Sequence, residues 1–169
     1  VEFWFYSTTS SGSQTLFHWS DISDSLDNDL VLTSAGAIQC RIGTGGTPAS
    51  AATTSSSSLW SVNTWHHIAA VRDSSNTVKV YLDGNLIINH GVRTDDMDNT
   101  LEIGRNPYSG GLDYLTGYIR DFRIDTTANY TSNFTVSQTS MEVNENTKLL
   151  TCHLPYLADG STNSYTVTS

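Results

Sequence analysis

The sequence predicts an all-β chain folded as an antiparallel β-sandwich. Three observations carry this prediction: short segments in which apolar and polar residues alternate, turn signals that separate them at short intervals, and the absence of any long amphipathic helical pattern in the 169 residues. A chain of this length can bury a core of its own as one domain.

The clearest segment is residues 65–88, WHHIAAVRDSSNTVKVYLDGNLII. Residues 65–71 and 77–82 are predicted strands, joined by a short polar loop. The second of them alternates apolar and polar side chains with the period of a half-buried strand. The Asp83-Gly84 pair between this strand and its return strand predicts a type I′ turn, since glycine adopts positive φ without steric cost.

Further strands are predicted on both sides of this segment, at residues 1–6, 15–19, 30–32, 37–42 and 146–154. Residues 30–32 and 37–42 are predicted to form a hairpin around the turn at residues 34–36. The Ser/Thr-rich stretch 43–58 is interpreted as a loop with a weak strand inside the domain. Residues 126–141 lack alternation, so we expect them to wrap the edge of the sandwich with Tyr130 and Phe134 as anchors. The last strand is expected to pair beside the N-terminal strand.

Composition excludes some classes of function. Eight Lys and Arg stand against 17 Asp and Glu, giving a net charge of −9, which argues against nucleic-acid binding. No run of 18 apolar residues predicts a membrane span, and no signal peptide is visible at the first residues.

The motifs of these strands resemble those of laminin-G-like, concanavalin A-like jelly-roll domains. A W-H-H-x-A strand, a V-x-V-Y-x-D-G strand, an I-G pair and a G-x-I-x-x-F-R-I strand follow one another in that family, and here they occupy residues 65–69, 78–84, 103–104 and 117–124. The resemblance implies a jelly roll of the lectin and glucanase type over residues 1–154, with a tail at 155–169 leading to a next module. Because the family usually has a further strand before this point, we expect the first strand to be missing and the chain to be part of a longer protein.

The C-terminal part resembles laminin-G-like modules in virion proteins of tailed, especially marine, bacteriophages. The matching residues are Tyr130, Thr131, Asn133–Thr135, Asn146–Cys152, Asp159, Ser161 and Asn163. The resemblance implies a non-enzymatic virion structural module of a tail fibre, tail-associated protein or capsid decoration. Such a module would bind host glycans or neighbouring virion proteins from the particle surface, as a homo-oligomer. The alternative is a secreted or cell-surface lectin-like adhesion domain that binds glycans with calcium.

Catalytic patterns are weak in this chain. Glucanases of this superfold carry an E-x-D-x-x-E motif, and none of Glu2, Glu102, Glu142 and Glu145 stands in one. Adjacent strand residues point to opposite faces, so His66 and His67 are not expected to share a metal ion. One of them is expected to pack beside Trp65, and the other to be exposed or bonded to a neighbouring strand.

Calcium is the cofactor that the sequence leaves open, because acidic loops supply the oxygen ligands that this ion prefers. Two loops qualify, and their candidate ligands are Asp24, Asp27 and Asp29 in the first and Asp95, Asp96 and Asp98 in the second. The alternative is that both are solvated rim loops.

A glycan site would need aromatic platforms beside polar side chains, and the loop NPYSGGLDY offers them. The candidates are Asn106, Tyr108, Asp113 and Tyr114. The alternative reading makes both tyrosines ordinary loop anchors and Tyr118 a core residue. Trp4, Trp19, Trp60 and Trp65 are expected in the core or at strand edges.

The two cysteines, Cys40 and Cys152, both share strand faces with apolar residues and are predicted to face the core. They are interpreted either as two buried free thiols or as a disulfide that joins distant strands.

Overall fold

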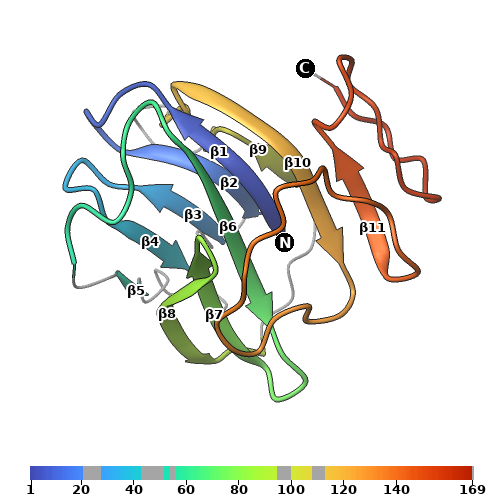
Figure 1. Cartoon of the computed structure of the whole chain (residues 1–169), viewed down its shortest axis with the longest axis horizontal. Helices are drawn as coiled ribbons and strands as arrows, with labels where there is room; N and C mark the ends of the chain where they lie inside the picture. Colours follow the sequence, from blue (N-terminus) through green and yellow to red (C-terminus); the bar gives the residue numbers. More distant parts are fainter. Residues whose placement is uncertain (21–27, 43–51, 54–55, 95–99, 108–112, 169) are drawn as a thin grey trace. The chain divides into compact units, whose positions relative to one another are not determined.

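Strands alone make up the regular structure in the computed structural model of the chain, which describes residues 1–20, 28–42, 52–53, 56–94, 100–107 and 113–168 (Figure 1). Within these residues eleven strands form two antiparallel sheets. The all-β, antiparallel prediction is therefore confirmed. No helix of membrane-spanning length and hydrophobicity occurs in this part of the chain.

One sheet has six strands in the order β11-β10-β1-β6-β7-β8. Their bounds are β1 Glu2–Ser7, β6 Trp65–Arg72, β7 Thr77–Leu82, β8 Asn85–Val92, β10 Gly117–Asp125 and β11 Thr147–Thr151. The other sheet has five strands in the order β5-β4-β3-β2-β9. Their bounds are β2 Gln14–Ser20, β3 Asp29–Leu32, β4 Ile38–Arg41, β5 Ala52–Thr53 and β9 Thr100–Ile103.

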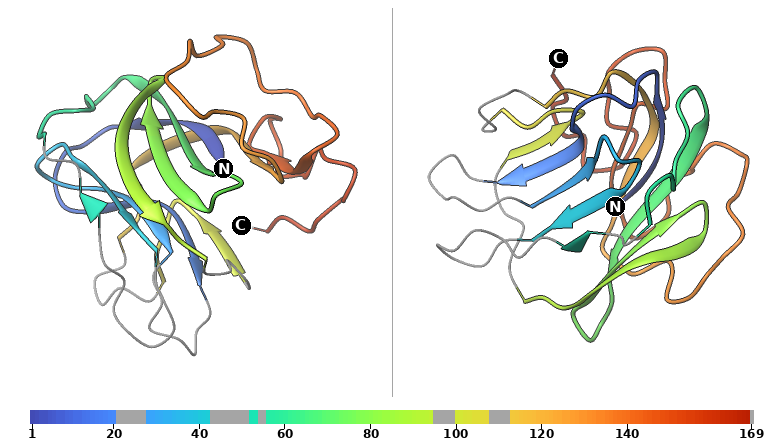
Figure 2. Two further views of the ribbon diagram at one scale, coloured as in Figure 1. Left: turned by 90° about the horizontal axis from the view of Figure 1, so that it is seen from below. Right: turned by 90° about the vertical axis from the view of Figure 1, so that its left-hand side faces the viewer.

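The chain divides into two compact units, which are described separately. The first unit contains Val1–Phe5, Trp65–Gly91 and Ile119–Ser169, and the second contains Tyr6–Thr64 and Val92–Tyr118. Figure 2 shows the strands of both units from two further directions.

The second unit is organised around the predicted hairpin of β3 and β4. These strands pair antiparallel with Leu32 opposite Ile38, and both side chains are fully buried. Trp60 is also buried, and its indole N–H donates to the Ala37 carbonyl at 3.4 Å. The hairpin prediction is confirmed.

The first unit shows the alternation of a strand most clearly in β1. Phe3 stacks on Phe122 of β10 with ring centroids 4.9 Å apart, and Phe5 lies beside His66. Glu2 and Trp4 point to the opposite face, where Trp4 meets His67 edge-on at 5.3 Å. This second face of the six-stranded sheet is called the Glu2 face below.

The turn between β7 and β8 has the predicted type I′ geometry, with positive φ at both Asp83 (48°) and Gly84 (81°). The Asp83 carboxylate accepts a hydrogen bond from the His67 backbone N–H at 2.8 Å and pairs with His66 Nδ1 at 2.7 Å. Burial alone would raise the pKa of Asp83, but these two histidine contacts outweigh it and lower the pKa. The turn therefore fixes β6 through its own side chain.

Residues 126–142, called the covering segment below, lie on the Glu2 face. Tyr130 and Phe134 stack at 3.5 Å and pack with Ala128 on a buried cluster of Ala69, Val71 and Tyr81. Figure 1 shows this segment in orange, crossing in front of β6 and β7. The prediction that Tyr130 and Phe134 anchor this connection is confirmed. The prediction that it wraps the edge of the sandwich is wrong, because its anchors pack on β6 and β7, which are inner strands of the sheet.

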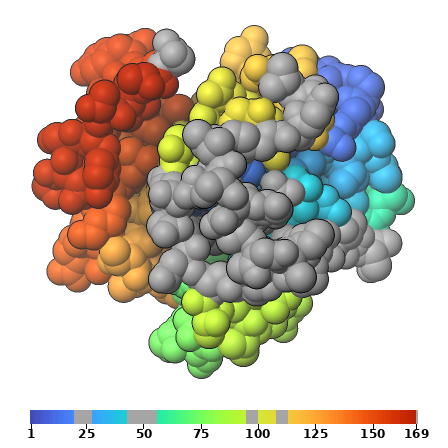
Figure 3. Space-filling view, turned by 180° about the vertical axis from the view of Figure 1, so that it is seen from behind, coloured from blue at the N-terminus to red at the C-terminus, as the bar shows by residue number. Residues whose placement is uncertain are grey.

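The predicted pairing of the last strand is wrong, because β11 pairs with β10 and not with β1. The register places Leu150 opposite Arg123, and β10 already occupies the edge of β1. The C-terminal residues then cover the free edge of β11: Asp159 accepts from the Leu150 N–H at 3.1 Å, and Ser161 donates to the Lys148 carbonyl at 2.9 Å. These residues form the red lobe of Figure 3. Capping of this kind removes an unpaired strand edge.

Two aromatic residues at strand ends are exposed. Tyr118, which the alternative interpretation placed in the core, is 63% exposed beside Tyr6 at the start of β10, and Trp65, expected in the core or at a strand edge, is 37% exposed at the start of β6. Both are the first or second residues of their strands, where the alternation pattern does not fix burial. Trp4 and Trp60 are buried as expected.

We predict that Gly84→Ala destabilises the protein more than Gly91→Ala does. Both glycines have positive φ, so each alanine costs about 1 kcal/mol of backbone strain. A Cβ on Gly84 would also lie 2.0 Å from the Phe134 carbonyl oxygen, whereas Gly91 has nothing within 4 Å. The difference in unfolding free energy is expected to reach about 1–3 kcal/mol in urea titrations. Equal losses for the two variants would mean that the covering segment does not lie against this turn.

Candidate functional site

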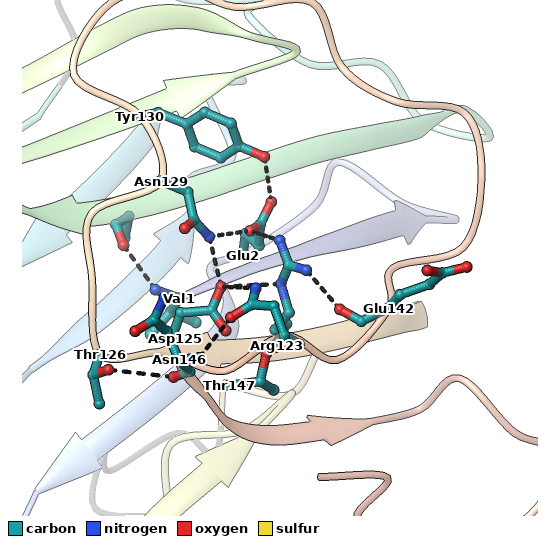
Figure 4. A network of polar contacts seen from close by, with 12 residues as sticks. Val1, Glu2, Arg123, Asp125, Thr126, Asn129, Tyr130, Glu142, Asn146 and Thr147 are labelled. Carbon is teal, nitrogen blue, oxygen red and sulfur yellow. Dashed lines mark hydrogen bonds and ion pairs between the residues drawn. The ribbon is translucent and has the colours of Figure 1, made fainter.

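The Glu2 carboxylate is the centre of a polar network on the Glu2 face (Figure 4). Glu2 is only 4% exposed, and each of its two oxygens accepts hydrogen bonds from two side chains. Oε1 accepts from Arg123 and from Asn129 at 3.0 Å, and Oε2 accepts from the Tyr130 hydroxyl at 2.8 Å and from His67 Nε2 at 3.2 Å. These donors come from β6, β10 and the covering segment.

The network holds Glu2 as a carboxylate. Burial alone would raise the pKa of Glu2, but the hydrogen bonds from His67, Arg123 and Tyr130 outweigh it and hold the pKa far below its usual range. Burial and the Glu2 charge together raise the pKa of Tyr130, so this hydroxyl stays a donor. Burial would lower the pKa of Arg123, but its contacts with Glu2 raise it instead.

Arg123 extends the network to the far end of the covering segment. Its Nη1 donates to the Glu142 carbonyl at 2.8 Å, and its Nε lies 3.3 Å from Asp125. Asn129 also donates to Asp125 at 2.6 Å. The covering segment is therefore fixed near both of its ends by side chains that meet at Glu2.

A cavity of about 330 Å³ lies between this network and the covering segment. Glu2, His67, Arg123 and Tyr130 line one side, and the other side is formed by Val136, Ser137, Thr139, Ser140, Met141 and Glu142. Four of the lining residues carry hydroxyl groups, which can both donate and accept hydrogen bonds: Tyr130, Ser137, Thr139 and Ser140. The volume is at the lower end of the range found for small-ligand sites.

Two tryptophans and an arginine lie on the same face and are linked to this cavity through His67. Trp4 contacts His67, which lines the cavity, and the Arg120 guanidinium carbon lies 4.9 Å from the Trp4 ring centre. The same carbon lies 5.1 Å from the ring centre of Trp65. Trp4, Trp65 and Arg120 are called the tryptophan–arginine group below. An exposed indole beside a polar cavity offers an apolar surface and hydrogen-bonding groups to one ligand.

The residues predicted for a glycan site are only partly in positions where they could serve one. Tyr114 is 49% exposed and fits the prediction of a platform, but Asn106 is 2% exposed and buried. The Asp113 backbone carbonyl accepts from the Thr15 N–H at 3.1 Å, which is a structural role. Tyr108 lies outside the described residues, so a site at this loop stays a prediction.

Most of the predicted calcium ligands, Asp24, Asp27, Asp95, Asp96 and Asp98, also lie outside the described residues. Asp29 is a buried residue of β3, and both of its carboxylate oxygens accept hydrogen bonds from Arg41. The arginine thus already neutralises this carboxylate. In the described ranges no three His, Cys, Asp or Glu side chains form a group that could hold a metal ion. Calcium binding at the two loops stays a prediction.

His66 and His67 are both buried, and each contacts a carboxylate. His66 pairs with Asp83, and His67 is bonded to Glu2 of the neighbouring strand β1, as expected for one of the two histidines. Both cysteines are free thiols, in agreement with the first of the two interpretations. Cys40 is buried, and burial raises its pKa to about 12, whereas Cys152 is only partly buried.

Sequence patterns alone did not identify the Glu2 network, although a signal was present. Glu2 is the one charged residue of the otherwise apolar run VEFWFY, and Arg123 lies between Phe122 and Ile124 in GYIRDFRI; both strands match the family motifs. A charge in such a run must either reach solvent or find an opposite charge. The pairing of these two residues, 121 positions apart in the chain, could have been proposed from this requirement.

Comparison with known proteins agrees with the strand order and motifs described above. The profile Laminin_G_3, described as "Concanavalin A-like lectin/glucanases superfamily", matches residues 1–136. The chain belongs to this superfamily. The jelly-roll fold class expected from the sequence motifs is thereby confirmed. No curated protein matches the chain significantly.

Solved structures of the same fold share little sequence with the chain. A candidate carbohydrate-binding protein of Bacteroides ovatus matches 95% of the chain with a TM-score of 0.66 and 18% identity, but the match covers only 45% of that protein. The CBM40 of Ruminococcus gnavus IT-sialidase, solved with α2,3-sialyllactose, matches 70% of the chain and 69% of its own (TM-score 0.55, 15% identity). Domains LG4-5 of the mouse laminin α1 chain match 78% of the chain and 38% of their own (TM-score 0.54, 17% identity).

We predict that Glu2→Gln removes a pH-dependent part of the stability. The pKa of Glu2 is lowered by folding, so its contribution is complete above the unfolded value of about 4.3 and is lost as the pH falls towards the folded value. The variant should lose about 2–4 kcal/mol at pH 7 and less at lower pH, measured by urea unfolding from pH 7 to pH 3.

Glu145→Gln is the matched control, because Glu145 is exposed and its replacement should leave both the stability and its pH dependence unchanged. A Glu2→Gln variant whose stability falls with pH as steeply as that of the wild type would contradict the assigned role of Glu2.

Proposed function

We propose that this chain is a non-catalytic glycan-binding adhesion module, with its binding site on the Glu2 face. The observation that carries the proposal is a polar cavity lined by Arg123, His67 and four hydroxyl residues, together with the exposed indole of Trp65 on the same face of the sheet. A sugar ring presents hydroxyl groups around its edge and C–H bonds on its faces. Hydroxyl and charged groups match the edge, and an indole ring matches a face.

The arrangement of the carboxylates supports binding without hydrolysis. A glycosidase needs one carboxylic acid that can give up a proton and one carboxylate free to attack or to activate water. Glu2 is the buried carboxylate of the cavity, and all of its acceptor positions are occupied by four donors. Its lowered pKa is the opposite of what a general acid requires.

The structural relatives support a role in glycan binding and adhesion. They include a candidate carbohydrate-binding protein, a CBM40 with bound sialyllactose and laminin LG domains. We place the module outside the cell. The chain spans less than half of the first of these relatives. Many copies of a weak site would then supply adhesion through avidity.

Within this setting we propose a virion surface, on a tail fibre, a tail-associated protein or a capsid decoration. The support is the sequence resemblance of residues 130–135, 146–152 and 159–163 to modules of tailed bacteriophages. A secreted or cell-surface adhesion domain is the alternative. Flanking assembly modules without an export signal in the full gene would favour the virion, and an export signal with a wall or membrane anchor would favour the cell surface.

We predict binding on a glycan array that Trp65→Ala weakens about tenfold or more, because the variant removes the exposed ring that faces the ligand. Tyr114→Ala is the matched control, since it removes a similarly exposed aromatic ring from the loop that the sequence suggested. Loss of binding in Tyr114→Ala with normal binding in Trp65→Ala would place the site at that loop instead.

The same array, run with calcium and again with a chelator, tests the ion. The site on the Glu2 face uses protein hydrogen-bond donors, so we expect its binding to persist in chelator. Binding that disappears with chelator would instead indicate the acidic loops that contain Asp24 and Asp96. A complete absence of glycan binding would contradict the proposal and favour neighbouring virion proteins as partners.

A further inference from the structure

Arg120 differs from the other well-placed arginines of the chain in having no acidic partner. Arg41, Arg105 and Arg123 are each paired with a carboxylate, on Asp29, Glu102 and Glu2 respectively. Within the described residues no carboxylate lies at ion-pair distance from Arg120, and its Nε is buried without a hydrogen-bond partner. The chain carries nine more acidic than basic charges, so an arginine left without a partner is unexpected.

The guanidinium of Arg120 is nevertheless held in a defined place. It lies 4.9 Å from the ring centre of Trp4 and 5.1 Å from that of Trp65, so two indole rings contact the same cation. Aromatic faces attract a guanidinium without using its N–H groups, which remain available to a ligand. Trp4 is itself fixed, because it is 5% exposed and packs on His67.

Asp121, the neighbour of Arg120 in the chain, does not form an ion pair with it. The two charges interact at longer range, but the Asp121 carboxylate accepts a hydrogen bond from the Met141 backbone N–H, and burial raises the pKa of Asp121. Arg123, in contrast, is paired with Glu2 and donates to the Glu142 carbonyl, although its Nε also makes no hydrogen bond. Among the described residues, Arg120 is therefore an arginine of the Glu2 face that has no carboxylate partner and lies beside an exposed aromatic ring.

We infer that the tryptophan–arginine group is a subsite for the anionic substituent of an acidic glycan. Arg120 would donate two parallel hydrogen bonds to the carboxylate of the sugar, while the exposed ring of Trp65 covers the adjoining apolar face of the same residue. A sulfate ester also presents anionic oxygens that can accept a pair of hydrogen bonds, although its sulfur is tetrahedral, and the shared chemistry is an anionic oxygen group on a sugar. This inference rests on the proposed glycan-binding function and names the class of glycan.

The test compares uronic acid polysaccharides with the same polysaccharides after reduction of their carboxyl groups to hydroxymethyl groups. Binding of the full chain is measured by biolayer interferometry at low and at high salt. We expect the acidic form to bind at least about tenfold more tightly than the reduced form, with an advantage that shrinks as salt is raised. Sulfated neutral polysaccharides in a parallel arm distinguish a sulfate from a carboxylate as the preferred anion.

Three variants test whether Arg120 is the source of the preference for the acidic polysaccharide. Arg120→Gln should abolish the preference for the acidic form, and Arg120→Lys should restore it only partly, because an ammonium group cannot form the paired hydrogen bonds. Lys148→Gln removes the same charge from an exposed position on β11 and should leave the preference unchanged. Melting temperatures of all three variants check that each one is folded.

Two results would overturn the inference in distinguishable ways. Equal binding of acidic and reduced polysaccharides, or an unchanged preference in folded Arg120→Gln, would contradict the anionic subsite and leave the proposed glycan-binding function in place. The absence of binding to every polysaccharide and to the glycan array would contradict both.

Discussion

The ion pair between Glu2 and Arg123 is the interaction on which the candidate site depends. A buried carboxylate is costly unless an opposite charge and hydrogen-bond donors surround it. Here four side chains satisfy Glu2, and they come from elements far apart in the sequence: β6, β10 and the covering segment. Any conformation that separates these elements leaves a buried charge without partners. The network therefore specifies one arrangement of the covering segment on the sheet.

The aromatic stack of Tyr130 and Phe134 supplies the apolar part of the same attachment. Phe134 packs edge-on against Tyr81 and His67, and its backbone N–H donates to the Gly84 carbonyl at 2.9 Å. Tyr130 belongs to both parts, since its ring lies in the stack and its hydroxyl reaches Glu2. The cavity exists because these contacts hold the segment at its ends while the hydroxyl-rich residues between them stand away from Glu2. Fold and site thus share one set of interactions.

Local patterns in the sequence predicted what depends on near neighbours. The β6–β7 hairpin, the type I′ turn at Asp83-Gly84 and the anchoring roles of Tyr130 and Phe134 were all accessible, because alternation and turn chemistry act over a few residues. The strand that pairs with β11 could not be predicted in this way, since the order of strands in a sheet depends on which strand already occupies each edge. Tyr118 was misplaced because alternation loses its meaning at the first residues of a strand.

The candidate site was harder to predict from the sequence than the strands were. Glu2, His67, Arg123 and Tyr130 come from four separate stretches of chain, and each of them alone has an ordinary structural interpretation. The sequence directed attention to Tyr114 and to acidic loops because their polar and aromatic residues are close together in the chain. The unpaired state of Arg120 could be found only in three dimensions, since it depends on where every carboxylate lies.

The most direct test of a glycan site on the Glu2 face uses the indole N–H signals of the four tryptophans, which nuclear magnetic resonance resolves individually in a ¹⁵N-labelled protein. Trp4 and Trp65 belong to the tryptophan–arginine group, and Trp19 and Trp60 belong to the other compact unit. On titration with the tightest glycan from the array, the signals of Trp65 and Trp4 should shift in a saturable way while those of Trp19 and Trp60 stay in place. Saturable shifts confined to Trp19 or Trp60 would show that the glycan binds elsewhere and would contradict the account.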